Sequence, residues 1–475
     1  MRRFFVLVVT ALLLAASPAL AAKNVILFIA DGAGFNCWRA ASMHEGKWDA
    51  ARQRSAQAYD APGWVHYGCT TYPLNLSRRP TGKSEQDPAL VYDPAKAWDA
   101  SPLSQLAGLF SGYKYLKQGA TDSAAAGTAL ATGEKTYNNA INWSVENQPF
   151  AGRTIAEIAK ARGRAVGVVS SVPWSHATPA TLGGAHNPER DQYAEIAKEM
   201  LNAPYLDVIM GTGNPDFDDN GQPAEKKADY VGGPETWRQL KEGKHPKGWR
   251  LIQSKEEFES LAANPPPALF KLLGVPQVYS TLQQARGKYR LDDSPFSQPL
   301  NANVPSLATL TKAAIHVLAR DPDGFFLMVE GGAVDWANHA NQAARAIEEQ
   351  IDFHHSVQAA VDWVEKHSNW DETLVICTAD HETGLIWGKQ SDKVAFEPIG
   401  DRGKGNVPDL RYHSLSHTNS LVPLAARGAG AEEFAKLARG VDATAGKHWG
   451  FSGQFVDNTD VFKVMSAALA DRHSK

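Results

Sequence analysis

Five short apolar runs, rich in β-branched residues, recur along the chain, and each ends in polar or glycine residues. They cover residues 23–32, 164–180, 206–215, 324–332 and 372–384. Continuous apolar runs of this length are typical of strands buried on both faces, as in a parallel sheet. Patterns with helical spacing lie between them, over residues 154–162, 191–202, 306–320 and 343–366.

The alternation of strands and helices predicts an α/β fold. We expect a large, doubly wound, mostly parallel central sheet flanked by helices, an α/β/α sandwich. In such sheets the ligand site lies outside the carboxyl ends of the strands. Residues 59–117 and 213–302 are interrupted by Pro, Gly and polar residues, and we interpret them as insertions into a single domain over residues 22–475.

The first 21 residues have a composition of their own. Arg2 and Arg3 precede an apolar run that ends in Pro18 and the small-residue sequence Ala-Leu-Ala at 19–21. This order predicts a secretory signal peptide over residues 1–21, cut after Ala21. The run is too short for a membrane anchor. We therefore expect an exported protein, periplasmic or extracellular, with no membrane anchor.

The overall charge argues against one class of partner. The formal net charge is −4, and the most basic stretch, residues 238–250, has the composition of a solvated surface segment. A nucleic-acid-binding protein would instead carry a basic face. We therefore expect no nucleic acid as a specific partner. The hydrophobic fraction of 43% is that of a globular protein with a sizeable core.

Two local features leave alternatives open. Three cysteines allow one disulfide, which could join Cys37 and Cys69, whereas Cys377 lies in an apolar run and is interpreted as a buried hydrophobic residue. The sequence DFDDNG at 216–221 matches the first half of an EF-hand loop. Lys227 stands where that loop needs its bidentate Glu, so an acidic turn is the favoured interpretation and calcium binding stays open.

A single hydroxyl stands at the head of a run of very small residues. In GATDSAAAGTALATG, residues 119–133, Ser123 follows an Asp and precedes three alanines. Such a residue could cap a helix or act as a nucleophile. No histidine lies nearby in the sequence to act as its base. A nucleophilic role therefore requires another source of activation.

Acidic and histidine residues gather where the apolar runs end. They are Asp31, Glu330, Asp335, His339, Asp380 and His381, with His413 and His417 later in the chain. Burying so many charges together is costly unless cations compensate them. Mixed His and carboxylate ligands suit zinc, and all-oxygen ligands suit magnesium.

Such metal ions would also supply the activation that Ser123 lacks. Two of them roughly 4 Å apart hold the attacking and leaving oxygens of an in-line displacement, and a metal ion lowers the pKa of a hydroxyl. The residues therefore suit phosphoryl transfer best.

Seven motifs occur in a specific order: ILFIADGAG, TDSAAAGTALATGEKTYNNAI, HATPA, AHNPER, VEGGAVDWANHA, TADHETG and SHT. In this order they resemble the alkaline phosphatase family, and the resemblance runs from Asn24 to the C-terminal DNTDVFKVMSAAL. It implies hydrolysis of phosphate monoesters. Ser123 would be the nucleophile that forms a phosphoserine intermediate, and Arg190 would grip the phosphoryl oxygens through its forked guanidinium.

The resemblance also implies two Zn²⁺ ions and one Mg²⁺ ion per chain. One zinc is implied at Asp335, His339 and His417. The second is implied at Asp31, Asp380 and His381, where it would also coordinate Ser123. The magnesium is implied at Asp31, Thr178 and Glu330.

Two positions depart from the best-known bacterial enzyme of the family. His176 replaces an Asp near the magnesium, and Trp336 replaces a Lys that contacts phosphate through water. Both choices resemble members from marine and cold environments, and both residues are expected beside the substrate. His413 has no ligand role in the family pattern. Family members are homodimers or monomers, so a homodimer is one expectation here.

Three other functions compete with this one. A phosphodiesterase of the same superfamily is the main alternative, although Arg190 and the magnesium set favour monoesters. A sulfatase would need a Pro and an Arg after its modified Cys or Ser, and DSAAAG at 122–127 lacks both. An exported metal- or phosphate-binding protein without turnover would not need a complete set of nucleophile and ligands.

Overall fold

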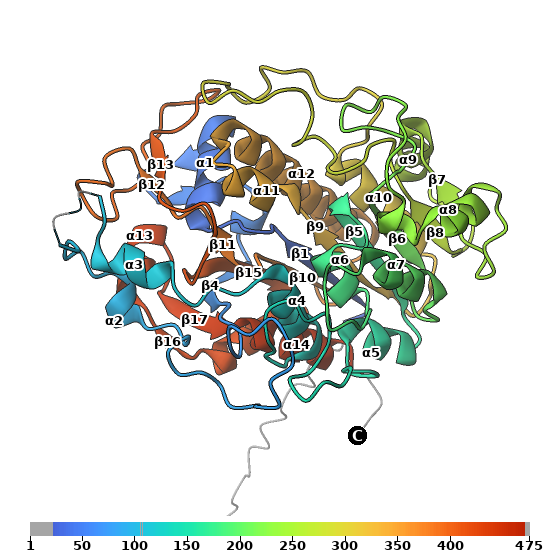
Figure 1. Ribbon diagram of the computed structural model, residues 1–475, viewed down its shortest axis with the longest axis horizontal. Coiled ribbons are helices and arrows are strands. Elements are labelled where there is room, and N and C mark those ends of the chain that lie inside the picture. The colour runs from blue at the N-terminus through green and yellow to red at the C-terminus, as the bar shows by residue number, and fades with distance from the viewer. Residues whose placement is uncertain (1–21, 105, 107, 471–475) are drawn as a thin grey trace, which may run out of the picture.

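An 11-stranded sheet with helices on both faces forms the core of the protein (Figure 1). The computed structural model describes residues 22–104, 106 and 108–470. The strand order is β16-β17-β4-β15-β10-β1-β9-β5-β6-β8-β7. From β10 to β7 all neighbours are parallel, whereas β15 is antiparallel to both β10 and β4. The expected mostly parallel sheet is therefore confirmed.

The five predicted strands form the centre of this sheet. They are β1 (Asn24–Ile29), β5 (Ala165–Pro173), β6 (Val208–Thr212), β9 (Phe325–Glu330) and β10 (Thr373–Thr378). All of their residues are buried, which explains why their sequences are continuous rather than alternating. In register, Ile29 pairs with both Glu330 and Thr378, so these strands end at one level of the sheet.

Helices cover the two faces and bury separate clusters of apolar side chains. In Figure 1 one layer lies above the sheet and contains α1 (Phe35–Glu45), α10 (Leu307–Leu318) and α12 (Ala343–His367). The layer below contains α4 (Ser123–Thr132), α5 (Ile155–Ala161), α6 (Ala177–Leu182), α7 (Tyr193–Asn202) and α14 (Asn458–Ala468). The predicted helices at 154–162, 191–202, 306–320 and 343–366 are confirmed as α5, α7, α10 and α12.

Shorter elements complete the fold. The helical ones are η1 (Ala58–Asp60), α2 (Pro94–Ala97), α3 (Ser111–Leu116), η2 (Asp229–Val231), α11 (Ala333–His339), η3 (Ala431–Leu437) and α13 (Ala443–Trp449). The strands are β2 (Trp48–Asp49), β3 (Arg54–Ser55), β11 (Glu382–Thr383), β12 (Ile386–Gly388), β13 (Leu410–Tyr412), β14 (His417–Thr418), β15 (Val422–Gly428), β16 (Gly440–Val441) and β17 (Gln454–Asp457). None of the described helices is long and apolar enough to cross a membrane.

The two segments interpreted as insertions both contribute strands to the sheet. Residues 59–117 contain β4 (Val65–Thr70), which lies between β15 and β17. Its pattern was missed because His66 and Gly68 interrupt it and its first two residues are only half-buried. Residues 213–302 contain the edge strand β7 (Arg250–Ile252) and its neighbour β8 (Leu272–Gly274), so both segments also take part in the sheet.

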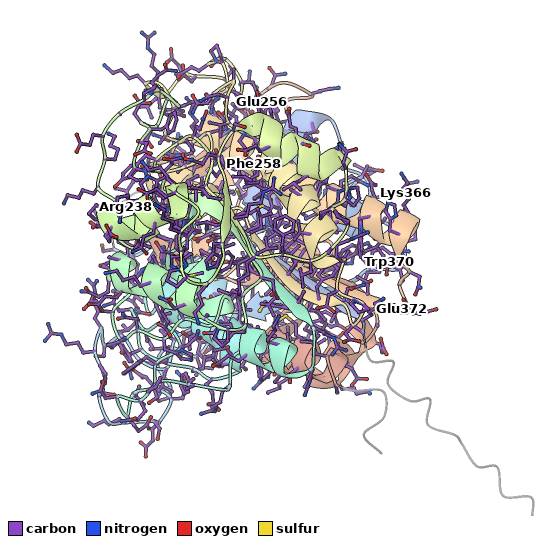
Figure 2. All side chains as sticks on the ribbon, turned by 90° about the vertical axis from the view of Figure 1, so that its right-hand side faces the viewer. Arg238, Glu256, Phe258, Lys366, Trp370 and Glu372 are labelled. Carbon is purple, nitrogen blue, oxygen red and sulfur yellow. The ribbon has the colours of Figure 1, made fainter. Side chains whose placement is uncertain are left out.

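The edge of the sheet is covered by two helices of the second segment, α8 (Pro234–Lys241) and α9 (Lys255–Ala263). Figure 2 looks at this end of the molecule, with Arg238 and Glu256 at the outer surface and Phe258 beneath α9. Phe258 is fully buried, and its ring lies so close to Gly274 of β8 that a Cβ there would come within 2.6 Å. Apolar packing thus fixes α9 to the sheet.

The disulfide between Cys37 and Cys69 does not form, since both thiols are free and buried. Cys37 on α1 belongs to the apolar cluster on one side of the sheet, and Cys69 on β4 belongs to the cluster on the other side. Cys377 is fully buried in β10, as its apolar run predicted. The predicted signal peptide, residues 1–21, lies outside the described residues.

Close packing of α4 against α6 generates the first prediction. A Cβ on Gly127 would lie 2.3 Å from the Thr181 hydroxyl oxygen, so Gly127→Ala should lower the free energy of unfolding by about 1–3 kcal/mol. Without that contact the same change would favour the helix. Urea denaturation measures the effect. The double variant with Thr181→Ala should recover stability, and a Gly127→Ala protein as stable as the parent would contradict the packing.

A buried carboxyl on α12 generates the second prediction. Burial and the charges of Asp352 and Glu348 raise the pKa of Glu349 to about 8, and its Oε1 has no hydrogen-bond partner among the described residues. In the unfolded chain the group loses its proton near pH 4.5, whereas the folded protein retains it until about pH 8. Folding stability should therefore fall as pH rises through this window.

Replacing the group should remove this loss. The Glu349→Gln variant should be more stable than the parent at pH 9, by a few kcal/mol, and similar to it at pH 4.5. Glu365→Gln, on the exposed side of the same helix, serves as the control and should follow the parent at both values. Chemical denaturation at the two pH values decides the matter, and an equal gain at both would refute a titrating Glu349.

Candidate active site

The predicted donor residues come together at the carboxyl edge of the central strands. Asp31 follows β1, Glu330 ends β9, and Asp380 and His381 follow β10. The short helix α11 begins just after β9 and presents Asp335 from its first turn. Because these strands end at one level, residues 350 positions apart in the chain become neighbours.

One cluster of donors contains Asp335, His339 and His417. The Nε2 atoms of the two histidines are 3.0 Å apart, and they lie 3.4 Å and 3.7 Å from the carboxylate oxygens of Asp335. Each Nδ1 lies 2.7 Å from a backbone carbonyl oxygen, that of Leu415 for His339 and that of Thr121 for His417.

These contacts decide what the first cluster can bind. A carbonyl oxygen can only accept a hydrogen bond, so the Nδ1 of each histidine must carry a proton. In a neutral ring this leaves Nε2 with a lone pair. Two lone pairs and a carboxylate that face one another suit a shared cation, and the carbonyl contacts are those that orient histidine ligands.

A second, deeper cluster surrounds Ser123. His381 Nε2 lies 3.2 Å from the Ser123 hydroxyl oxygen, 3.2 Å from Asp380 Oδ2 and 3.5 Å from Asp31 Oδ1. Asp31, Asp335 and His381 also satisfy the geometry of a metal-binding group. His381 is fully buried, and its ring stacks on that of His417 at 3.6 Å, which links the two clusters.

Several buried oxygens of this region have no hydrogen-bond partner among the described residues. They are Asp31 Oδ1, Thr178 Oγ1, Glu330 Oε1 and Asp380 Oδ2. Buried polar atoms are normally satisfied, so four unpaired oxygens in one place are suited to coordinate a cation. Three of them belong to the expected magnesium set, and an all-oxygen set fits that ion. The residues present therefore fit both kinds of metal ion.

Electrostatics support the same conclusion. Burial and the charge of Asp335 raise the pKa of Asp380 to about 6, and burial raises that of Glu330 to about 7. Burial and Asp380 raise the pKa of Asp31 well above its ordinary value. Burial lowers the pKa of His381 well below its ordinary value, which keeps the imidazole neutral. A bound cation would stabilise the ionised carboxylates and accept the neutral imidazole.

Ser123 is the first residue of α4 and does not cap the helix. The cap is Asp122, whose carboxylate accepts a hydrogen bond from Ala125 N at 2.9 Å. Ser123 is nearly buried, and its hydroxyl is directed towards His381. The alanines at 124–126 are buried too, which lets the helix pack closely under the site. Ser123 therefore faces the donor cluster, and Asp122 caps the helix.

Arg190 lies beside the serine through an ion pair with Asp122, whose Oδ2 is 3.0 Å from Arg190 Nη1. His176 sits at the start of α6, with its ring stacked on Tyr193 and edge-on to Trp336. Burial and the charge of Arg190 lower the pKa of His176 to about 3, so this ring is neutral. Both family-variable residues therefore lie in one aromatic group beside Arg190.

Sequence reasoning missed the residues that hold the donors in place. Asp122 orients Arg190, the Ser170 hydroxyl donates to Glu330, and the Thr383 hydroxyl donates to Asp335 at 2.6 Å. Thr383 lies inside the TADHETG motif, which could have drawn attention to it, but Ser170 has no local signal.

Two other features lie apart from the donors. His413 binds the Ser391 hydroxyl at 2.7 Å and packs on Tyr113, so it supports a loop. In the acidic turn, Asp218 accepts hydrogen bonds from Asn220 N and Gln222 N, an arrangement typical of an Asx turn.

The sheet order and the donor clusters define an α/β protein with a group of potential metal ligands at the carboxyl edge of its sheet. A sequence model of one family, described as Alkaline phosphatase, matches residues 97–396. This match spans more than half of the chain, and the protein therefore belongs to the alkaline phosphatase family.

Individual relatives agree with this assignment. Alkaline phosphatase 3 of Bacillus subtilis is 34% identical over 273 residues, 56% of this chain and 50% of that protein, so the match spans half of this relative. Alkaline phosphatase of Escherichia coli K12 is 29% identical over 411 residues, 79% of each chain. The cold-active alkaline phosphatase of a psychrophilic Shewanella shares the fold, with a TM-score of 0.60, 22% identity and coverage of 94% of this chain and 100% of its own.

Metal binding at the first cluster should be visible in thermal stability. Chelator-treated protein should unfold at a lower temperature than the same protein with zinc added back, because a ligand that binds only the folded state stabilises it, by about 4 kcal/mol at a thousandfold excess over Kd. Asp335→Asn keeps the residue's shape and should abolish most of this gain. His413→Asn, which alters a histidine outside the clusters, should preserve it. Equal responses in all three proteins would reject the site.

Proposed function

We propose that the protein hydrolyses phosphate monoesters through a phosphoserine intermediate on Ser123. The observation that carries this proposal is the position of the Ser123 hydroxyl, 3.2 Å from His381 Nε2, at the start of α4 and beside two sets of metal-ligating atoms. Membership of the alkaline phosphatase family supports the reaction class. It also favours monoesters over the diesters of the alternative function.

Two zinc ions and one magnesium ion are the proposed cofactors. Asp335, His339 and His417 would hold one zinc, Asp31, Asp380 and His381 the other, and Asp31, Thr178 and Glu330 the magnesium. When bound, such ions supply positive charge that lowers the pKa of a neighbouring hydroxyl or water. Magnesium is present in a solved variant of the Antarctic alkaline phosphatase TAB5, which has a similar fold.

The chain's own residues would perform the steps of the transfer. Ser123 Oγ attacks phosphorus in line with the leaving oxygen, and water later attacks the phosphoserine and regenerates the hydroxyl. Arg190 donates hydrogen bonds to the equatorial oxygens. Its ion pair with Asp122, which also binds the Asn139 N–H, sets its direction.

The start of α4 would add further donors. Asp122 already binds the Ala125 N–H, which leaves the N–H groups of Ser123 and Ala124 to receive a phosphoryl oxygen. These groups are fixed before substrate arrives, so they stabilise charge as it develops without reorganising. His176 and Trp336 would line the substrate side of the magnesium set. Export to the periplasm or beyond, and a homodimeric state, are further parts of this proposal.

The nucleophile assignment is tested by Ser123→Ala with an aryl phosphate substrate. Loss of the covalent route should lower kcat by about a thousandfold or more, and acid quenching should no longer trap a phosphoryl group on the protein. Ser111→Ala changes the first residue of another helix, α3, and is the matched control. Retained phosphoryl trapping in the Ser123 variant would refute the assignment.

Arg190→Ala should lower kcat/KM by about a hundredfold or more, as expected for loss of a group that binds developing charge. Its loss should weaken inhibition by inorganic phosphate as well, because phosphate uses the same contacts. Parallel assays with an aryl phosphate diester separate the two functions. Faster turnover of the diester than of the monoester would favour the phosphodiesterase alternative.

A further inference from the structure

A second cavity lies beneath α1 and shares no lining residue with the candidate active site. It has a volume of about 310 Å³, and its walls come from α1, the β2–β3 hairpin, η1, β4, β15 and the segment that follows α13. A volume of this order is at the lower end for small-molecule sites. The cavity is large enough for a small organic ligand.

The apolar part of the lining is aromatic and flat. The ring of Phe35 stacks on that of Trp449, with centroids 4.3 Å apart and planes 5° from parallel, and on that of Phe451 at 5.5 Å. Trp38 and Trp48 contribute two further indole rings to the lining. Because these rings stack on one another, a guest would lie against the aromatic lining and not between its rings. A planar aromatic guest suits such a surface, because offset stacking adds to the gain from burial.

The polar part of the lining includes hydrogen-bond donors that have no acceptor among the described residues. Arg39 is only 8% exposed, and its Nη2 has no hydrogen-bond partner among the described residues. Its guanidinium instead lies over the Trp48 ring, 4.6 Å from the centroid. Trp38 and Trp449 line the same cavity, and their indole N–H groups are likewise buried without a partner among the described residues.

Three unsatisfied donors are costly, and an unsatisfied buried guanidinium most of all. The Asp60 carboxylate of the lining acts on Arg39 through its charge alone, since no hydrogen bond joins them among the described residues. Asp60 instead accepts hydrogen bonds from the Ser55 N–H and hydroxyl and lies 3.1 Å from His66 Nε2. The cavity therefore calls for a ligand that brings acceptors and one negative charge. A second charge would be opposed by the Asp60 carboxylate nearby.

We propose that this cavity is a ligand site for a small aromatic carboxylate, with the ring against the aromatic lining and the carboxylate on Arg39. A carboxylate supplies one charge and two acceptor oxygens in a plane, which matches the free edge of a guanidinium. This site is separate from the phosphate-binding residues, and it does not depend on the proposed function.

Calorimetric titration with 2-naphthoate tests the site, in excess inorganic phosphate so that the active site is filled. The expected result is saturable binding with one site per chain. The neutral 2-naphthamide, which keeps the ring and loses the charge, should bind about tenfold more weakly, and acetate, which lacks the ring, should not bind detectably. Equal binding of the amide, displacement by phosphate, or no binding of naphthoate would overturn the proposal.

Three variants test whether naphthoate binds in this cavity. Arg39→Met keeps the length and apolar stem of the side chain and should weaken naphthoate binding at least tenfold, while hydrolysis of an aryl phosphate stays unchanged. Arg52→Met, on the exposed tip of the same β2–β3 hairpin, should bind like the parent. Trp48→Leu should also weaken binding, which covers the case in which Arg39→Met fails to fold. Light scattering measures the number of subunits in each variant. If Arg39→Met changed the number of subunits and left the affinity for naphthoate unchanged, the proposal would be wrong and the cavity would be an interface between two copies of the chain.

Discussion

The structure depends on one electrostatic constraint: several carboxylates and neutral histidines share a buried space at the carboxyl edge of the sheet. Asp31, Glu330 and Asp380 are fixed there by the ends of three adjacent parallel strands, and none can move away without disturbing the sheet register. Their pKa values are raised because burial and the neighbouring carboxylates disfavour the ionised forms. A cation is the simplest compensation, so the proposed metal sites would follow from the arrangement of these strands.

The central sheet could be predicted from the sequence because its strands are buried on both faces. That burial leaves an apolar run that is hard to mistake, as in residues 324–330 of β9. The helices predicted over residues 154–162 and 306–320 begin at Thr154 and Ser306, and the hydroxyls of these residues cap α5 and α10 by binding N–H groups of the first turn. Local chemistry was therefore sufficient for these elements.

The remaining features depend on partners that are distant in the chain. Strand β4 is defined by its neighbours β15 and β17, and its own residues alternate too weakly to reveal it. The donor residues were named from their types and positions, but His417 reaches them only because β14 pairs with β11. The supports Asp122, Ser170 and Thr383 act on residues 48 to 160 positions away, so no local pattern encodes them.

The two donor clusters differ in depth, and this difference has a kinetic consequence. His381 is fully buried behind the ring of His417, whereas the His339 side chain in the outer cluster is 37% exposed. An ion held by the outer histidines would therefore lie nearer to solvent than one held by His381 and its neighbours. Such an outer ion would be the first to exchange with solvent. The apparent metal content of a preparation would then depend on its history as well as on its affinities.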